Sequence, residues 1–89
     1  MFTNRYGKRN NIIGLAVARR RKEQHISQRQ LADKLQLMGL DIDKNAVQRI
    51  ESGQRFVTDI ELDIIAKYFD IAAITLITES HAQYANSKE

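Results

Sequence analysis

Four polar side chains able to recognise a partner by hydrogen bonding lie within six positions of one another: Lys44, Asn45, Gln48 and Arg49. Lys and Arg carry only donors, whereas the amides of Asn and Gln carry donors and acceptors. Val47 and Ile50, three positions apart, share one face of a helix and leave the polar groups on the others. A short helix with this much polar chemistry is predicted to bind a partner.

The residue types that catalysis and metal binding need are sparse. The chain has no Cys, which removes thiolate nucleophiles, disulfides and Cys-based zinc sites. Its two His residues, His25 and His81, have no other ligand at metal-binding spacing. No nucleophile–base pair and no glycine loop for phosphate is visible. We therefore expect no enzyme, no cofactor and no metal site.

The charge of the chain is unevenly distributed. Residues 1–55 contain twelve Lys and Arg against five Asp and Glu, a net charge of +7, whereas residues 56–89 contain two against six, a net charge of −4. A basic half on a folded domain favours one docking face for a polyanion. No apolar run approaches the roughly 18 to 20 residues that span a membrane, and the first ten residues lack the apolar stretch of a signal peptide. We expect a cytoplasmic protein without membrane contact.

The elements that must position these side chains are all helical. Residues 11–24 form an amphipathic pattern with a basic polar face, and Ser27 with Gln30 makes a capping box for a second helix that Gly39 ends. Leu37 or Met38 can extend the apolar stripe of that helix. Asp43 is the predicted N-cap of the third helix, which ends near residues 51–53.

Two further helices follow. Thr58 and Glu61 make a second capping box, before a helix whose predicted buried residues are Leu62, Ile65, Ala66 and Phe69. Residues 71–79 are apolar enough for a strand, but no second strand is available to pair with them, so a short fifth helix is preferred. We expect one domain over residues 11–79, with a basic arm at 1–10 and a tail at 80–89 that is frayed or extends the helix.

The predicted helices carry a set of short motifs in a fixed order: Ile13-Gly14, Val17, Arg21, Ile26-Ser27-Gln28, Leu31-Ala32, Val47, Arg49-Ile50-Glu51, Gly53, Arg55, Leu62, Ile65-Ala66 and Phe69–Ile71. In these motifs, over about residues 12–77, the sequence resembles the Cro/repressor-type helix-turn-helix proteins, the XRE family. The resemblance implies an all-α, compact five-helix lambda-repressor-like domain. The third helix of such a domain lies in the major groove of DNA.

Carried over position by position, the resemblance implies specific DNA contacts. Lys44, Asn45 and Arg49 would reach base edges, and Gln48 would assist them. Arg and Lys can donate to guanine N7 and O6, and Asn can pair bidentately with adenine, which supports these roles independently. The predicted phosphate contacts come from the start of helix two, from the loop after helix three and from helix one: Gln28, Arg29, Arg55 and Arg19. For Arg19 a purely solvated role is equally open.

Glu51 has a structural role by the same resemblance, because the matching Glu pairs with the residue at the position of Arg21. A carboxylate in the last turn of a helix is otherwise disfavoured by the helix dipole. The basic arm, with Arg5, Tyr6, Lys8 and Arg9, can reach around the duplex or into its minor groove, or remain a solubilising terminus.

The sequence departs from the family between Leu35 and Asp43, where about five residues are added. We expect helix two to be about one turn longer, and the turn to be a loop in which Leu40 and Ile42 fold back over the helix end. Asp41 would repel phosphate, so it should point away from the duplex.

The preferred function is a sequence-specific double-stranded DNA-binding regulator, a repressor, that acts as a homodimer through its C-terminal segment (Ile71, Ile74, Leu76 and Ile77). Simple closure of the core is the alternative explanation for those apolar residues. The second hypothesis is a protein-interaction module, such as an antitoxin or anti-repressor, that binds a protein partner. We expect no long toxin-neutralising segment after residue 79, which weakens this alternative.

Overall fold

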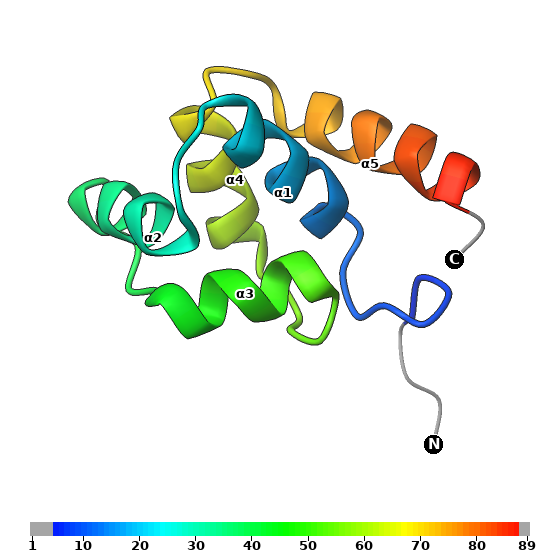
Figure 1. The fold of residues 1–89 in the computed structure, drawn as a ribbon, viewed down its shortest axis with the longest axis horizontal. Helices are drawn as coiled ribbons and strands as arrows, with labels where there is room; N and C mark the ends of the chain where they lie inside the picture. Colours follow the sequence, from blue (N-terminus) through cyan, green and yellow to red (C-terminus); the bar gives the residue numbers. More distant parts are fainter. Residues whose placement is uncertain (1–4, 88–89) are drawn as a thin grey trace.

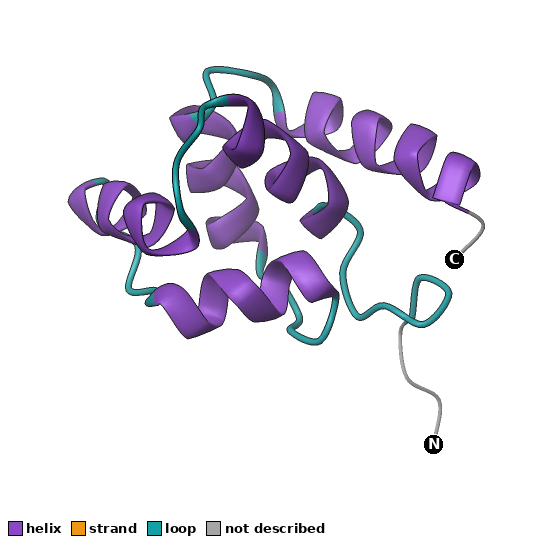
Figure 2. Ribbon diagram, in the orientation of Figure 1, coloured by secondary structure: helices purple, strands orange, loops and turns teal. Residues whose placement is uncertain are grey.

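The computed structural model describes residues 5–87, and the chain between these limits is helical (Figures 1 and 2). The helices are α1 (Gly14–Glu23), α2 (Gln28–Leu37), α3 (Lys44–Ser52), α4 (Asp59–Tyr68) and α5 (Ala73–Ser87). α1 lies centrally and packs against both α3 and α5, while α2 packs against α3 and α4. The predicted all-α, five-helix fold is confirmed for the described residues.

Three helices begin at the side-chain caps that the sequence predicts. Ser27 Oγ accepts from Gln30 N at 3.0 Å, and Gln30 Oε1 accepts from Ser27 N at 2.8 Å. Thr58 and Glu61 repeat this arrangement at the start of α4. At the start of α3, Asp43 Oδ1 accepts from Ala46 N at 2.8 Å. These bonds satisfy amide groups that have no partner inside a helix.

The start of α1 differs from the prediction, because the helix begins at Gly14 rather than at residue 11. Asn11 Oδ1 accepts from Gly14 N at 2.9 Å and so caps the helix from outside. A Cβ on Gly14 would overlap the carbonyl oxygen of Ile50. Glycine therefore permits the close approach of α1 to the end of α3.

Helices α1 to α4 end in one backbone arrangement, the Schellman motif, in which a residue with positive φ follows the helix. At these four helix ends the residues with positive φ are His25 (58°), Gly39 (93°), Gly53 (87°) and Asp70 (58°). At the end of α2, for example, Gly39 N donates to Gln36 O at 3.0 Å and Leu40 N donates to Leu35 O at 3.1 Å. Two of these four positions carry residues other than glycine, for which this conformation is strained.

The long connection between α2 and α3 packs as expected. Leu40 and Ile42 are buried beneath the end of α2, and Gln36 Nε2 donates to the Ile42 carbonyl at 2.8 Å. The expected extension of the apolar stripe is wrong, since Leu37 is 89% exposed and Met38 is 41% exposed. Beyond Leu35, the buried apolar side chains of this segment are therefore those of the loop, Leu40 and Ile42.

The core lies between all five helices and includes Leu31, Leu35, Val47, Ile50, Ile65 and Leu76. Of the residues predicted to be buried in α4, Ile65, Ala66 and Phe69 are buried and Leu62 is partly buried. The fifth helix was expected over residues 71–79, followed by a tail that is frayed or extends the helix; α5 begins at Ala73 and continues to Ser87, which agrees with the second alternative. Contacts with other elements support the extension, because Ser80 is buried and its Oγ accepts from Ala16 N at 3.1 Å. Residues 88–89 of the predicted tail lie outside the described part.

The described part of the predicted basic arm, residues 5–10, packs against the domain. Tyr6 and Arg9 exchange two backbone hydrogen bonds of 2.7 and 2.9 Å, which close a tight turn. Arg9 is only 3% exposed, and the Tyr6 hydroxyl is hydrogen-bonded to His81 Nδ1 at 2.7 Å. Arg9 and Tyr6 are thus committed to contacts within the protein, so neither alternative for the arm, reaching the duplex or remaining a solubilising terminus, describes these two residues. Residues 1–4 of the arm lie outside the described residues.

Candidate nucleic-acid interface

The exposed face of α3 carries all four predicted base-contacting residues. Lys44, Asn45, Gln48 and Arg49 are exposed along the helix. The opposite face is formed by Ala46, Val47 and Ile50, which are at most 6% exposed. α3 lies at the edge of the molecule in Figure 1. Because its apolar side is buried and its polar residues are exposed, the polar side is open to a partner.

Arg29, at the start of α2, lies beside the N-terminal end of α3. Together with Asp43, Lys44 and Asn45 it lines a shallow hollow of about 170 Å³. Arg29 is exposed, so its guanidinium adds a positive charge next to the polar face of α3. The structure brings together one predicted phosphate-contacting residue and two predicted base-contacting residues.

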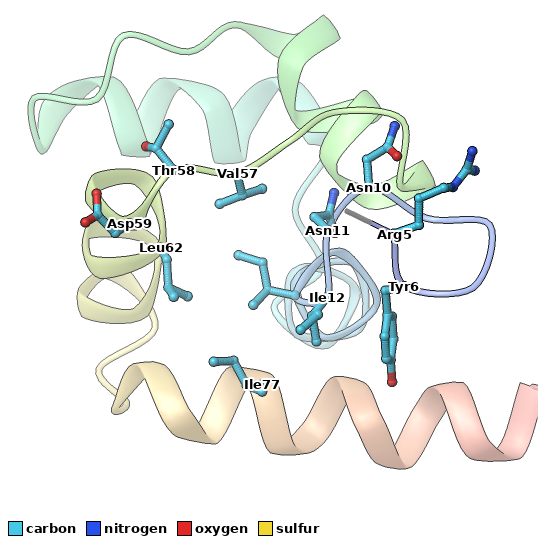
Figure 3. A pocket seen from close by; sticks show the side chains of 11 residues that line it. Arg5, Tyr6, Asn10, Asn11, Ile12, Val57, Thr58, Asp59, Leu62 and Ile77 are labelled. Carbon is cyan, nitrogen blue, oxygen red and sulfur yellow. The ribbon is translucent and has the colours of Figure 1, made fainter. Parts of the chain in front are cut away.

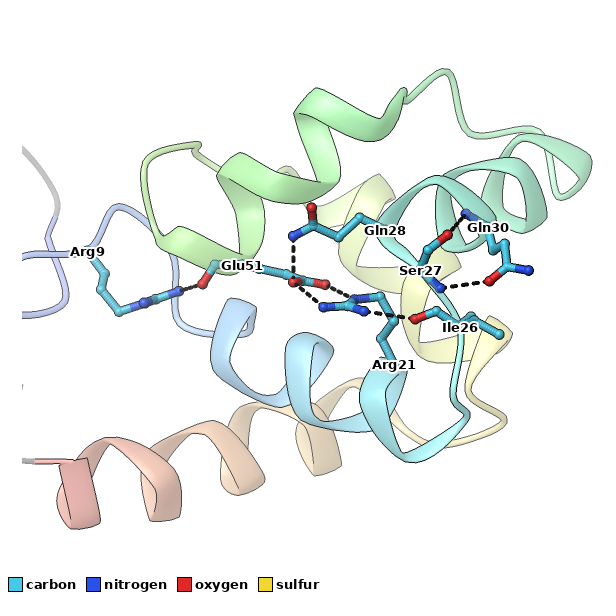
Figure 4. A network of polar contacts seen from close by, with 7 residues as sticks. All are labelled: Arg9, Arg21, Ile26, Ser27, Gln28, Gln30 and Glu51. Atoms are coloured by element: carbon cyan, nitrogen blue, oxygen red, sulfur yellow. Dashed lines mark hydrogen bonds and ion pairs between the residues drawn. The ribbon is translucent and has the colours of Figure 1, made fainter.

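A polar network joins α1, α2 and α3 through Arg21, Gln28 and Glu51 (Figure 4). Arg21 donates from Nε to Glu51 Oε2 at 2.7 Å and from Nη2 to Glu51 Oε1 at 3.1 Å. Gln28 Nε2 donates to the same Oε1 at 3.0 Å, and Arg21 Nη1 donates to the Ile26 carbonyl at 2.8 Å. The pKa of Arg21 is raised, mainly by its hydrogen bonds to the Glu51 carboxylate. The amide nitrogen of Gln28 is therefore engaged in the network that joins α1, α2 and α3.

Arg55, predicted to bind phosphate, is paired with a buried carboxylate. Its Nη1 donates to Glu61 Oε1 at 2.8 Å, while its side chain stays 27% exposed. The Arg55 hydrogen bond lowers the pKa of Glu61, and a backbone hydrogen bond from Thr58 lowers it further. Glu61 of α4 thus holds the side chain of Arg55, which lies in the loop that follows α3.

Arg19, also predicted to bind phosphate, lies on a different side of the molecule. It pairs with Glu79 of α5 at 3.1 Å and with Glu23 at 3.6 Å. Two residues along a helix correspond to a rotation of about 200°. Because Arg21 points to α3, Arg19 points to α5, and the structure corrects its placement at the interface.

A helix-turn-helix family model matches residues 17–73, more than half of the chain. The chain belongs to the XRE-type helix-turn-helix family. Comparisons with curated proteins and with solved structures give no match. As a member of this family it is a DNA-binding regulator of the XRE type. In helix-turn-helix proteins the second helix of the motif is called the recognition helix. By its order in the chain α3 corresponds to that helix, and it is given that name below.

The XRE-type protein also holds its recognition helix through residues that the sequence analysis missed. Arg9 Nη2 donates to the Glu51 carbonyl at 2.6 Å, and Asn11 Nδ2 donates to the Ile50 carbonyl at 3.0 Å and the Arg55 carbonyl at 2.8 Å. Carbonyl groups at a helix end lack partners within the helix. The sequence indicates that the carbonyl groups at the end of this helix need hydrogen-bond donors. It does not indicate which residues, some forty positions away, supply them.

A cavity of about 430 Å³ is lined entirely by residues outside α3 (Figure 3). Its apolar wall is formed by Ile12, Ile13, Val57, Leu62 and Ile77. Residues 5–87 contain no group of three or more acidic or His residues that could hold a metal ion. None of the helices in this described range has the length and apolar character needed to cross a membrane.

Proposed function

We propose that this protein is a sequence-specific transcriptional repressor that acts in the cytoplasm by occupying double-stranded DNA. The observation that carries the proposal is the two-sided character of α3. One side is buried, and the other presents Lys44, Asn45, Gln48 and Arg49 to a partner. A helix of this kind fits the major groove, where base edges display distinct donors and acceptors.

In the proposed complex, Lys44, Asn45 and Arg49 contact base edges, with Gln48 assisting. Arg49 and Lys44 donate to guanine, and the Asn45 amide pairs with adenine; each good bidentate contact contributes about 1–3 kcal/mol of discrimination. The Asp43 carboxylate accepts a hydrogen bond from the backbone amide of Ala46. This bond offsets the repulsion between the carboxylate and a nearby phosphate. Asp41 is exposed, and we propose that it points away from the duplex.

Arg29 is the first of the proposed phosphate contacts, because it is exposed beside Lys44 and Asn45. Arg55 and Gln28 join it through the exposed parts of their side chains, while Glu61 and Glu51 fix their positions. Arg19 is not part of this set, since it lies toward α5.

We further propose a homodimer formed through α5, which suits a palindromic site with half-sites about 34–36 Å apart. Ile74 is 65% exposed, and Ile71 and Ile77 are partly exposed. Leu76 was expected on this surface, but it is fully buried in the core. Ile74 is therefore the residue on which the proposed contact depends most.

Selection of bound sequences from a random duplex pool tests the function. A repressor is expected to yield a consensus, and a palindromic consensus reports the dimer as well. Titration with salt should then show a steep loss of affinity on selected and random duplexes together with a large specificity ratio. Weak binding with little sequence preference would favour a protein-interaction module instead.

A further inference from the structure

The C-terminal turn of α3 is held by a short stretch of chain that precedes α1, which we call the N-terminal strap (residues 6–11). Besides the bonds from Arg9 and Asn11, Asn10 N donates to the Gly53 carbonyl at 2.7 Å and Asn10 Nδ2 donates to the Gln54 carbonyl at 3.0 Å. The strap thereby binds five carbonyl groups between residues 50 and 55. The Arg9 guanidinium also places positive charge at the negative end of the helix dipole, where it is favourable.

There is no spare space between the strap and the recognition helix. A Cβ on Gly53 would lie 2.9 Å from both Cγ and Cζ of Arg9. A Cβ on Gly14 would lie 2.6 Å from Arg9 Nη2 and 2.8 Å from Asn11 Oδ1. Glycine on both sides lets the Arg9 side chain lie between the end of α3 and the start of α1. A packed side chain of this kind transmits its position to its neighbours.

The other end of the strap is attached to α5. The Tyr6 ring lies 4.3 Å from the Tyr84 ring, measured between centroids, and the Tyr6 hydroxyl binds His81. A side chain at Gly7, whose φ is 61°, would overlap the Tyr84 hydroxyl. The strap thus connects α5 to the C-terminal end of α3 through contacts at both of its ends.

We propose that Arg9 is a positioning residue for DNA recognition, because it sets the orientation of the recognition helix relative to the rest of the domain. The proposal rests on the proposed function. α3 is nine residues long, about 13 Å, so a tilt at its C-terminal end displaces the side chains of Lys44 and Asn45 at the other end. Recognition groups have to be held to within about 0.5 Å of their productive positions. Arg9 is itself buried, so in this proposal it acts through α3 and not by touching DNA.

The test is Arg9→Met, which keeps most of the aliphatic stem and removes the guanidinium. The affinity for the selected duplex should fall about tenfold, equivalent to about 1.4 kcal/mol, while the affinity for a random duplex and its salt dependence stay as in the wild type. Arg9→Lys retains the charge and should recover part of the specificity. It also keeps the test possible if Arg9→Met fails to fold.

The matched control is Arg20→Met, which breaks the hydrogen bonds of Arg20 to Glu79 between α1 and α5. It removes a partly buried guanidinium from α1 without touching α3, so the specificity ratio should be unchanged. An equal loss of affinity for selected and random duplexes in Arg9→Met would overturn the proposal. So would a loss of specificity in Arg20→Met as large as in Arg9→Met.

Amide hydrogen exchange of the DNA-free protein separates failure of this inference from failure of the proposed function. The amides of residues 53–55, which donate to carbonyl groups of α3, should exchange faster in Arg9→Met than in Arg20→Met. If the wild type has no sequence preference, the proposed function fails, while faster exchange in Arg9→Met alone still supports the positioning role. Equal exchange in the two variants overturns that role.

Discussion

Arg21 of α1 and Glu51 of α3 form a bidentate ion pair, with two parallel hydrogen bonds of 2.7 and 3.1 Å. Their side chains are 11% and 7% exposed, so both charges are largely removed from water. The Glu51 carboxylate accepts a further hydrogen bond from Gln28, and the Arg21 guanidinium donates a further one to the Ile26 carbonyl. The pair therefore ties the recognition helix to α1 and offsets the unfavourable position of Glu51 at a helix C-terminus.

Replacing Arg21 by Met should destabilise the fold by about 3 kcal/mol, because it leaves the Glu51 carboxylate buried without its counter-ion. Denaturant unfolding measures this change. Arg19→Met is the control, since Arg19 is 43% exposed and its ion pairs contribute at most about 1 kcal/mol. A variant Arg21→Met with the stability of the wild type would show that the pair contributes nothing. In Arg21→Met, the change in the free energy that separates selected from random duplexes should be smaller than the change in the free energy of unfolding.

Stability should depend on pH through Glu61 and Glu79. Hydrogen bonds from Arg55 and from Arg20, respectively, lower the pKa of each carboxyl below the ordinary value of 4.5. A lowered pKa in the folded state means that the stabilisation is fully present above the ordinary value and is lost as the pH falls through the folded value. Thermal unfolding should show constant stability above about pH 6 and a progressive loss below about pH 4.5.

Glu61→Gln should lower the stability at neutral pH by about 2 kcal/mol, because a charge-assisted hydrogen bond is lost. Its loss of stability in acid should be smaller than that of the wild type, since one of the responsible carboxyls is gone. Arg55→Met removes the partner that lowers the pKa of Glu61 and should reduce the acid dependence in the same way. An unchanged acid limb in both variants would mean that this pair is not a source of the pH dependence.

Much of the fold follows from short-range patterns. The caps at Ser27, Asp43 and Thr58 and the helix ends at Gly39 and Gly53 involve residues only a few positions apart, so their spacing is visible in the chain. The Arg21–Glu51 pair was expected only through the family resemblance. Local pattern therefore suffices where the partners are neighbours in sequence.

The strap could not be found in this way. Arg9 and Asn11 meet residues about forty positions away, and a basic, polar segment has the same composition whether it packs or not. The extension of α5 likewise depends on the contacts of Ser80 and Tyr84 with other elements. Arg19 lies two positions from Arg21 and so faces away from α3, where it meets Glu79 of α5, a partner that lies far away in the sequence.

Gly39 and Gly53 should respond differently to alanine, although both have positive φ. Gly39→Ala should cost about 1 kcal/mol of backbone strain alone, because no atom lies within 4 Å of the added Cβ. Gly53→Ala should cost about 1–3 kcal/mol more, since the Cβ would collide with Arg9. Denaturant unfolding of the two variants measures the difference. Equal losses would indicate that Arg9 moves aside without cost.

Asn45→Ala should relax the sequence preference at one base pair. The loss of a bidentate amide contact corresponds to about 1–3 kcal/mol of discrimination at that position, with preferences elsewhere in the site retained. Repeating the selection with the variant measures this. Asn86→Ala, at an exposed position near the end of α5, is the matched control and should leave the consensus unchanged. If Asn45→Ala weakened binding to every sequence equally, Asn45 would be a contact for positioning instead.

Ile74→Asp should disrupt the proposed homodimer without unfolding the domain. Ile74 is 65% exposed in the single chain, so a charge is tolerated there in the monomer but would be buried in the proposed contact. Sedimentation should show a dimer for the wild type and a monomer for the variant, and the variant should bind a palindromic site more weakly than the wild type does. Thr78 is exposed one turn further along α5, so sedimentation of Thr78→Asp shows whether the dimer contact extends to that turn. A wild-type protein that remains monomeric at high concentration and on DNA would leave Ile74 as an ordinary surface residue.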